Sequence, residues 1–244
     1  MRACFIGDMM NDSESLYDNV RSKIKYNIIN GKYPMGMRLK AKELADELYV
    51  SRTPVNKALS SLYEEGLLNY NRNVGYSVRI ITIEDIEEIF KIRLALDIVA
   101  FKEASLNMDE DDFSYMRSLI DRADLASKNC QTDDLRQAAK VFNHTIYEYA
   151  DMPRLTMIID NLNDYLEVLR KFSFDGRSEN SRYLVSVEEH SKILDLMQAH
   201  NFDQLEAVII KHLEGSRNYI IGESYKYRDF ILIDDKRKHN DKEV

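Results

Sequence analysis

The chain has 244 residues, of which 44% are hydrophobic and 31% charged, and its net charge is −8. The length allows two modest domains, and the absence of any apolar run of about 18 residues argues against a transmembrane span or membrane association. The first residues, which include Asp8, do not resemble a signal peptide. Cys4 and Cys130 lack metal-binding spacing and are typical of free thiols, so we expect a cytoplasmic protein.

The charge is unevenly distributed along the chain. Residues 13–80 contain 11 Lys or Arg and 7 Asp or Glu, a net charge of +4, whereas residues 1–12 carry −1 and the remaining residues −11. Basic surfaces attract phosphate and acidic surfaces repel it. This division favours a DNA-binding front part followed by a body that does not touch DNA.

Three helices are predicted in the front part. An amphipathic helix over 16–30 is followed by a Gly- and Pro-containing turn over 31–36. Apolar residues at helical spacing then predict two shorter helices, over 41–48 and 51–65, joined by a tight turn.

The last of these helices is predicted to expose its N-terminal end. Ser51 stands at the N-cap, and Pro54 lies in the first turn, where a missing N–H costs little. Arg52, Thr53 and Asn56 then lie at the end that a helix-turn-helix inserts into the major groove. The pattern therefore predicts a DNA-binding unit.

A β hairpin is predicted after this helix. Gly66 ends the helix, and two β-prone runs, 67–70 and 76–81, flank the polar residues 71–75. With the three helices, the hairpin completes a winged helix-turn-helix over residues 13–80.

The rest of the chain is predicted to be helical, because it contains almost no Gly or Pro and its apolar residues recur at helical spacing. Six blocks have this pattern: 83–107, 109–128, 132–150, 153–173, 181–200 and 202–224. They predict an all-helical antiparallel bundle over 81–227, with tails at 1–12 and 228–244. The expected fold class is mainly α, with a small β wing.

Motifs in both parts support a family resemblance. In the front part they are Gly31, Pro34-Met35-Gly36, Leu39, Leu44-Ala45, Val50-Ser51-Arg52-Thr53-Pro54-Val55, Ala58-Leu59, Leu62, Glu65-Gly66-Leu67-Leu68 and Gly75. In the body they are Ile92-Arg93, Leu96-Asp97, His144-Thr145-Ile146-Tyr147-Glu148, Pro153-Arg154-Leu155, Glu189-His190, Ile193-Leu194 and His212. The chain resembles the GntR family of bacterial transcription regulators, in the FadR-like class that carries an FCD effector domain.

The resemblance implies a set of DNA-contacting residues: Lys42, Ser51, Arg52, Thr53, Asn56, Asn73 and Gly75. Arg52 suits guanine, Ser51 and Thr53 suit phosphate oxygens, and Gly75 lets the wing backbone approach the duplex.

Three residues depart from the usual family pattern in this region. The family usually has Arg-Glu where this chain has Asn56-Lys57. Because Asn pairs with adenine, we expect a changed operator base pair there; a phosphate contact by Asn56 is the alternative. Tyr49, in the turn, is expected to pack rather than to touch DNA.

For the body, the resemblance implies a divalent metal ion, such as Zn²⁺, Ni²⁺ or Mn²⁺, bound by His144, His190 and His212. The family's fourth ligand precedes the first histidine by four residues, and here that residue is Lys140, which cannot ligate while protonated.

Three interpretations of the body remain open. The three imidazoles alone bind the metal; or Lys140 replaces its charge and binds an organic acid together with Arg93, with Arg170 nearby; or the histidines form a buried polar network. Asp97 either pairs with Arg93 or is solvated.

The resemblance implies a ligand-responsive regulator. We expect a homodimer that binds a short palindromic operator, mainly as a repressor, and whose DNA affinity changes when an organic acid binds the body. Two alternatives are a metal-dependent hydrolase, for which Glu189 is the candidate base, and an architectural DNA-binding protein without an effector. We expect no enzymatic activity.

Overall fold

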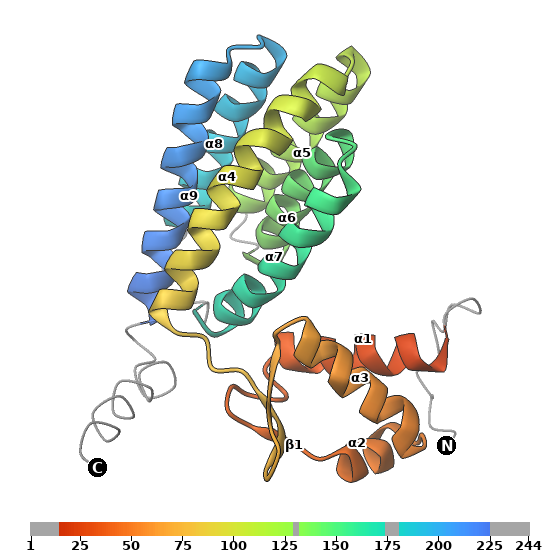
Figure 1. The fold of residues 1–244 in the computed structure, drawn as a ribbon. Coiled ribbons are helices and arrows are strands. Elements are labelled where there is room, and N and C mark those ends of the chain that lie inside the picture. Colours follow the sequence, from red (N-terminus) through yellow and green to blue (C-terminus); the bar gives the residue numbers. More distant parts are fainter. Residues whose placement is uncertain (1–14, 129–131, 174–180, 225–244) are drawn as a thin grey trace, which may run out of the picture. The chain divides into compact units, whose positions relative to one another are not determined.

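The computed structural model describes residues 15–128, 132–173 and 181–224 (Figure 1). The chain divides into two compact units, 1–80 and 81–244. The first is a winged helix-turn-helix and the second is helical, which confirms the predicted fold class. Within the described residues, no helix combines the length and the apolar character that crossing a bilayer requires. Both predicted tails lie outside the described residues.

The first unit contains three helices and a small antiparallel sheet with strand order β1-β3-β2. Its elements are α1 (Leu16–Ile29), β1 (Arg38–Leu39), α2 (Ala41–Leu48), α3 (Arg52–Glu64), β2 (Leu68–Asn71) and β3 (Gly75–Val78). The two-residue strand β1, which pairs with β3, was not predicted, because two residues are too few to show an alternating pattern.

Helices α1 and α3 pack against each other through apolar side chains. Ile24 from α1, and Val55, Leu59 and Leu62 from α3, are completely buried. One face of α3 is therefore buried against the core of this unit, and the residues on its opposite face are exposed to solvent.

Tyr49 ends α2 in a left-handed backbone conformation, with φ 56° and ψ 41°. Tyr49 is 95% exposed, so the expectation that its side chain packs against the protein is wrong. A side chain in this conformation costs roughly 1–2 kcal/mol, and Tyr49 buries no surface that would offset this cost.

Replacing Tyr49 with glycine should therefore stabilise the first unit. We expect Tyr49→Gly to raise its free energy of unfolding by up to about 1 kcal/mol, because relief of strain outweighs the larger unfolded-state entropy of glycine. Urea denaturation of the full-length protein, followed by circular dichroism, measures the change. Tyr26→Gly is the matched control, since Tyr26 is also exposed but lies inside α1, where glycine costs about 1 kcal/mol. A loss of stability in both variants would contradict the argument.

The second unit is built from six helices within the described residues. They are α4 (Ile83–Asn107), α5 (Glu110–Lys128), α6 (Thr132–Tyr149), α7 (Pro153–Ser173), α8 (Ser181–Gln198) and α9 (Phe202–Ser224). A capping box begins α4: the Thr82 hydroxyl accepts from the Asp85 N–H, while the Asp85 carboxylate accepts from the Thr82 N–H.

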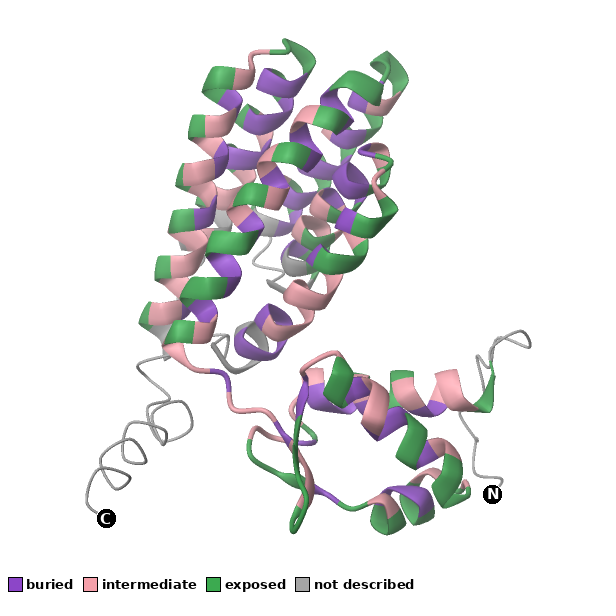
Figure 2. Ribbon diagram, in the orientation of Figure 1, coloured by how far each residue is buried: buried purple, intermediate pink, exposed green. Residues whose placement is uncertain are grey.

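The helices of this unit surround a common core. Helix α4 packs against α6, α7 and α9, and α5 packs against α6 and α8 (Figure 1). Buried positions line the inner sides of these helices, and exposed positions lie on their outer sides (Figure 2). Each helix therefore has a defined inner face, and a polar residue is available for ligand binding in the bundle only when it lies on that face.

Candidate functional site

The N-terminal end of α3 presents a continuous set of polar side chains to solvent. Ser51, Arg52, Thr53 and Asn56 are all exposed, whereas Val55, between them, is completely buried. This arrangement follows from the helical period of 3.6 residues, which directs Val55 to the core and its neighbours outward. The end of α3 can thus enter a groove without disturbing the core.

The polar groups at this end have few bonds within the protein. Ser51 occupies the N-cap position, but its side chain makes no capping hydrogen bond. Arg52 forms no ion pair with any described residue, and Glu47, its potential neighbour, instead binds Lys32 Nζ at 2.5 Å and Tyr33 Oη at 2.9 Å. Arg52 is therefore available to contact DNA.

The wing is a tight turn between β2 and β3. The Asn71 side chain accepts a hydrogen bond from the Asn73 N–H at 2.9 Å, and the Asn71 carbonyl accepts one from the Val74 N–H at 3.0 Å. Gly75 has φ +88°, a value that favours glycine, and the space around it is open. Asn73 is exposed at the tip, and Lys42 is exposed on α2.

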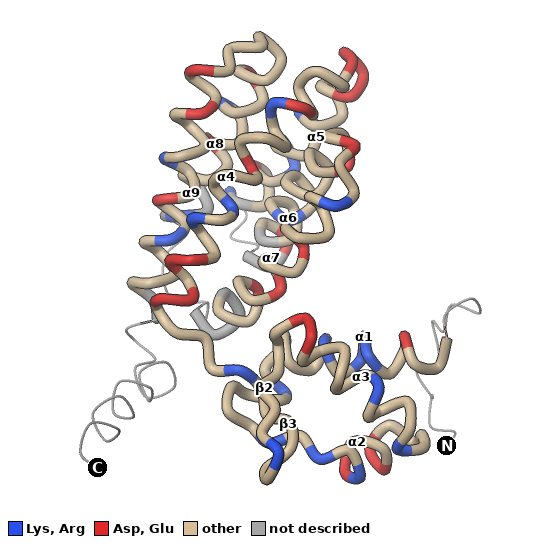
Figure 3. The backbone as a smooth tube through the Cα atoms, viewed as in Figure 1, with Lys and Arg blue, Asp and Glu red and all other residues tan. Residues whose placement is uncertain are grey.

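An aromatic cluster attaches the wing to α3. Tyr70 and Tyr76 face each other across the two strands with ring centroids 4.9 Å apart, and Tyr63 of α3 lies 6.2 Å from Tyr70 and 6.4 Å from Tyr76. Lys and Arg occur along α1, α2, α3 and the wing (Figure 3). The wing thus packs against the C-terminal end of α3, and the wing and α3 both carry basic side chains.

In the second unit, His190 of α8 and His212 of α9 lie together. Their ring centroids are 4.9 Å apart, and both side chains are almost completely buried. His144 does not lie with them. Its side chain is 46% exposed, and its Nδ1 atom lies 3.4 Å from the Oε1 atom of Glu148 on the same helix. The prediction that three histidines converge is therefore wrong for His144.

The error has a simple cause in the orientation of α6. Phe142 is buried and Ala139 lines a cavity, so the inner face of α6 includes these positions and the half-buried Asn143. Lys140 and His144 are both exposed on the outer face. Residue 144 is two positions from Phe142, a rotation of about 200° around the helix. The predicted role of Lys140 in binding an effector is not supported either.

His212 belongs to a buried ionic network with Glu189 and Arg182. Its Nδ1 donates to Glu189 Oε2 at 2.8 Å, and Arg182 forms an ion pair with the same oxygen at 3.0 Å. Arg182 also donates to the His212 carbonyl at 2.8 Å and to Ser216 Oγ at 2.9 Å. Burial alone would raise the pKa of Glu189, but the bonds from His212 and Arg182 outweigh it and lower that pKa.

The two buried histidines are held in their neutral form. Burial, and then the neighbouring His212 and Arg182, lower the pKa of His190 well below its usual 6.5. Burial also lowers the pKa of His212, although Glu189 opposes that effect. His190 stacks on Phe142 with ring centroids 4.4 Å apart and an interplanar angle of 15°.

These lowered pKa values make the second unit sensitive to acid. The unfolded chain binds protons at these histidines below about pH 6.5, whereas the folded chain does not, so stability is complete above that pH and falls as the pH decreases. We expect each histidine to lower the free energy of unfolding by at most about 1 kcal/mol between about pH 6.5 and 5.5. In urea denaturation at a series of pH values, His190→Gln should show a smaller loss of the free energy of unfolding between these two pH values, because it lacks one of the two buried histidines. His144→Gln, which removes no buried imidazole, is the control, and an equal pH dependence in both variants would contradict the prediction.

Arg93, predicted to bind an effector, is instead part of a closed buried group. Its Nη2 donates to Asp97 Oδ2 at 2.8 Å and to Tyr147 Oη at 3.2 Å, and Tyr147 donates to Asp97 Oδ1 at 2.9 Å. The pairing of Asp97 with Arg93 is thereby confirmed. Burial alone would lower the pKa of Arg93, but Asp97 and Tyr147 raise it, so Arg93 stays charged. The side chain of Arg170 lies outside the described residues.

The donor set does not fit the three-histidine metal site. His190 and His212 are the only two predicted ligands that meet, and the Nδ1 atom of His212 is bonded to Glu189. Glu189 is neutralised by Arg182. Across the described ranges, no cluster of three or more His, Cys, Asp or Glu side chains is arranged to hold a metal ion.

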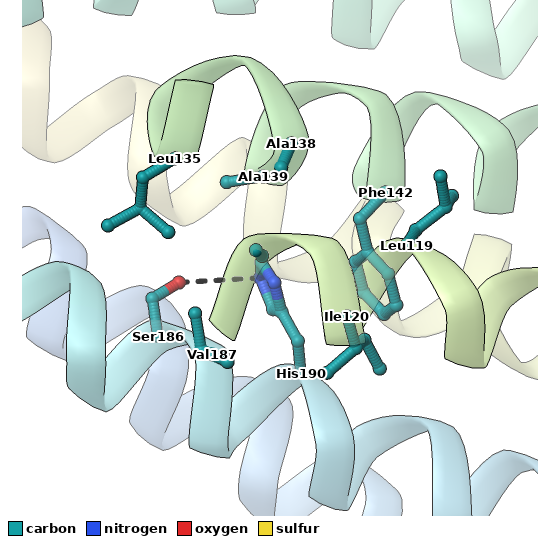
Figure 4. A pocket seen from close by; sticks show the side chains of 10 residues that line it. Leu119, Ile120, Leu135, Ala138, Ala139, Phe142, Ser186, Val187 and His190 are labelled. Atoms are coloured by element: carbon teal, nitrogen blue, oxygen red, sulfur yellow. Dashed lines mark hydrogen bonds between the residues drawn. The ribbon is translucent and has the colours of Figure 1, made fainter. Parts of the chain in front are cut away.

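A cavity lies between α5, α6 and α8, next to His190 (Figure 4). Its empty space is about 280 Å³ when the part open to solvent is counted, but the space comparable to that of known cavities is only about 10 Å³, room for about one water molecule. Among the described residues, the side chains that line it are Leu119, Ile120, Ala123, Leu135, Ala138, Ala139, Phe142, Ser186, Val187 and His190. Ser186, whose Oγ lies 3.5 Å from His190 Nε2, was not predicted, although its position one helical turn before His190 was a usable signal.

Comparisons with known proteins agree with this architecture. Residues 16–78 match the family model described as bacterial regulatory proteins of the gntR family, and residues 88–215 match that of the FCD domain. The chain is similar to the uncharacterized HTH-type transcriptional regulator YdhC of Bacillus subtilis, with 23% identity over 78% of this chain and 84% of YdhC. It is also similar to the HTH-type transcriptional repressor RspR of Escherichia coli, with 23% identity over 84% of this chain and 89% of RspR.

A solved structure shows the same fold. The E. coli protein McbR/YncC superimposes with a TM-score of 0.73 at 20% identity, over 86% of this chain and 99% of that chain. The family models together span most of the chain and coincide with the winged helix-turn-helix and the helical bundle. The chain therefore belongs to the gntR family of bacterial transcription regulators and carries an FCD domain.

Proposed function

We propose that the protein is a ligand-responsive repressor that binds a short inverted-repeat operator as a homodimer. The observation that carries the proposal is the exposed N-terminal end of α3, where Arg52, Thr53 and Asn56 project beside a buried Val55. Two identical units related by a twofold axis bind two half-sites in opposite orientation, which makes the operator an inverted repeat. Repression is supported by the similarity to RspR, a protein named as a repressor.

Each predicted DNA-contacting residue has a role in this proposal. Arg52 binds guanine in the major groove, and Asn56, one turn later on α3, binds adenine. Ser51, Thr53 and Lys42 bind phosphates and position the helix, and the wing tip, with Asn73 and Gly75, adds a backbone contact.

The match of the second unit to the FCD domain supports a sensing role and disfavours an architectural protein without an effector. Ligand binding there would shift the population between arrangements of the two heads that fit or miss the operator. The hydrolase alternative is not supported, because Glu189, its candidate base, is already bonded to Arg182 and His212.

Selection of operators from a random double-stranded DNA pool by the full-length protein tests the proposal. We expect one enriched inverted repeat, bound by a protein that light scattering shows to be a dimer. Asn56→Arg should change the preferred base under this residue from adenine to guanine, with Lys57→Arg, a substitution at the next exposed position, as the control. Recovery of no enriched sequence would overturn the proposal, and an unchanged preference in Asn56→Arg would show that Asn56 contacts only phosphate.

A further inference from the structure

Tyr49 has an unfavourable backbone conformation that no contact of its side chain offsets. Its φ is 56°, and at 95% it is the most exposed of the large apolar and aromatic residues that the structure describes. Its side chain makes no hydrogen bond, ion pair or ring contact with any described residue. Glycine would adopt this conformation at a lower cost. The fold of the first unit therefore gives no reason for a tyrosine at this position.

Two other described residues that are not glycine have a positive φ, and each has a local explanation. His200 has φ 50°; its Nδ1 atom lies 2.9 Å from Ser105 Oγ, and its ring centroid lies 6.0 Å from that of Phe202. Asp151 is of a residue type that adopts this conformation readily. Tyr49 shares neither explanation. Because backbone strain of this kind is concentrated at functional sites, it indicates a contact outside the folded chain.

Tyr49 lies beside the end of α3 that is proposed to enter the major groove. It is the C-cap of α2, and only Val50 separates it from Ser51, the N-cap of α3. Two Cα–Cα steps of about 3.8 Å place its Cα atom at most about 7.6 Å from that of Ser51. In a helix-turn-helix, the second helix reads the bases while the first crosses the DNA backbone. An exposed side chain at the end of the first helix is therefore expected to meet phosphates next to the bases that Arg52 contacts.

We infer that Tyr49 donates a hydrogen bond from its phenolic hydroxyl to a phosphate of the operator and helps to position α3 in the groove. This inference rests on the proposed DNA-binding function and adds a residue to the contacts given there. A phenolic hydroxyl is a hydrogen-bond donor, and tyrosine is among the side chains that bond to phosphate oxygens in protein–DNA complexes. Because a phosphate contact carries no sequence information, Tyr49 contributes to affinity and leaves the preferred sequence unchanged.

Two variants of the full-length protein test the contact by fluorescence anisotropy with the selected operator. Tyr49→Phe removes only the hydroxyl and should weaken binding about tenfold, the loss expected for one hydrogen bond to a charged group, while selecting the same operator sequence. Tyr49→Gly should weaken binding at least as much, although it relieves the backbone strain and stabilises the unit, so that affinity and stability change in opposite directions. Tyr26→Phe, at an exposed position of α1, is the control and should change neither quantity.

Operators with one neutral methylphosphonate group identify the phosphate. At one position in each half-site, the replacement should weaken binding by the unsubstituted protein and by Tyr26→Phe. It should weaken binding by Tyr49→Phe much less, because that variant has already lost the contact. Equal effects on the unsubstituted protein and on Tyr49→Phe at every phosphate would overturn the inference. A loss of affinity in Tyr49→Gly alone would also overturn the hydrogen bond, because only the ring would then contact DNA.

The unsubstituted protein separates this inference from the function on which it rests. If it selects no operator, the proposed function and the inference fail together. If it selects an operator that both Tyr49 variants bind with unchanged affinity, only the inference fails, and the protein remains a DNA-binding regulator whose Tyr49 does not contact the operator.

Discussion

Arg52→Ala should weaken binding of the full-length protein to its selected operator roughly tenfold to a hundredfold, because a bidentate contact with guanine contributes about 1–3 kcal/mol of discrimination. Arg52 is exposed at the first position of α3 and is not engaged in an ion pair with any described residue, so its removal should leave the fold unchanged. Fluorescence anisotropy with labelled operator at one fixed salt concentration measures the affinity, and circular dichroism checks the fold.

Two further variants distinguish base recognition from simple charge. Lys42→Ala should weaken binding to operator and to unrelated DNA alike. It should also reduce the slope of log affinity against log salt concentration by about one, the value for one phosphate contact. Lys23→Ala removes an exposed cation of α1 that lies over Tyr26 and should change neither. If Arg52→Ala weakens binding to operator and unrelated DNA by the same factor, Arg52 contacts phosphate and reads no base.

The first unit was largely predictable because its signals are local. The apolar spacing, the N-cap at Ser51 and the glycine in the wing each act within a few residues of sequence. Strand β1 was missed because its two residues are too few to show an alternating pattern and its partner, β3, lies far away in the chain. The exposure of Tyr49 was missed because an aromatic residue usually packs, and only the structure shows that the turn points it away from both helices.

The helices of the second unit were also predictable, but the arrangement of polar groups between them was not. Periodicity locates a helix along the chain, whereas its rotation depends on the helices that pack around it. A shift of one position separates Asn143, on the inner side of α6, from the exposed His144, and a histidine is compatible with either environment. Arg93 and Arg182 each pair with a carboxylate on their own helix, Asp97 on α4 and Glu189 on α8, but the burial of these pairs depends on the helices packed around them. Because both arginines are paired, neither is a free cation for binding a ligand.

Among the proposed substitutions, one within the buried group of Arg93, Asp97 and Tyr147 should have the largest effect on stability. We expect Asp97→Ala to lower the free energy of unfolding of the second unit by about 3–5 kcal/mol, because the substitution leaves the Arg93 charge buried and unpaired. Burial and the neighbouring Asp97 raise the pKa of Tyr147, so its neutral hydroxyl cannot compensate the charge. Urea denaturation of the full-length protein provides the measurement.

Comparison variants determine whether the loss comes from the unpaired charge. Arg93→Met combined with Asp97→Leu removes both charges and should recover most of the stability lost in Asp97→Ala. Lys102→Ala, on the same helix, breaks a partly exposed ion pair with Glu206 of similar length, 2.7 Å, and should cost no more than about 1 kcal/mol. A double variant as unstable as Asp97→Ala would mean that the three polar side chains stabilise the bundle through their mutual hydrogen bonds. In that case Arg93 would contribute more to the core than an apolar residue of its size.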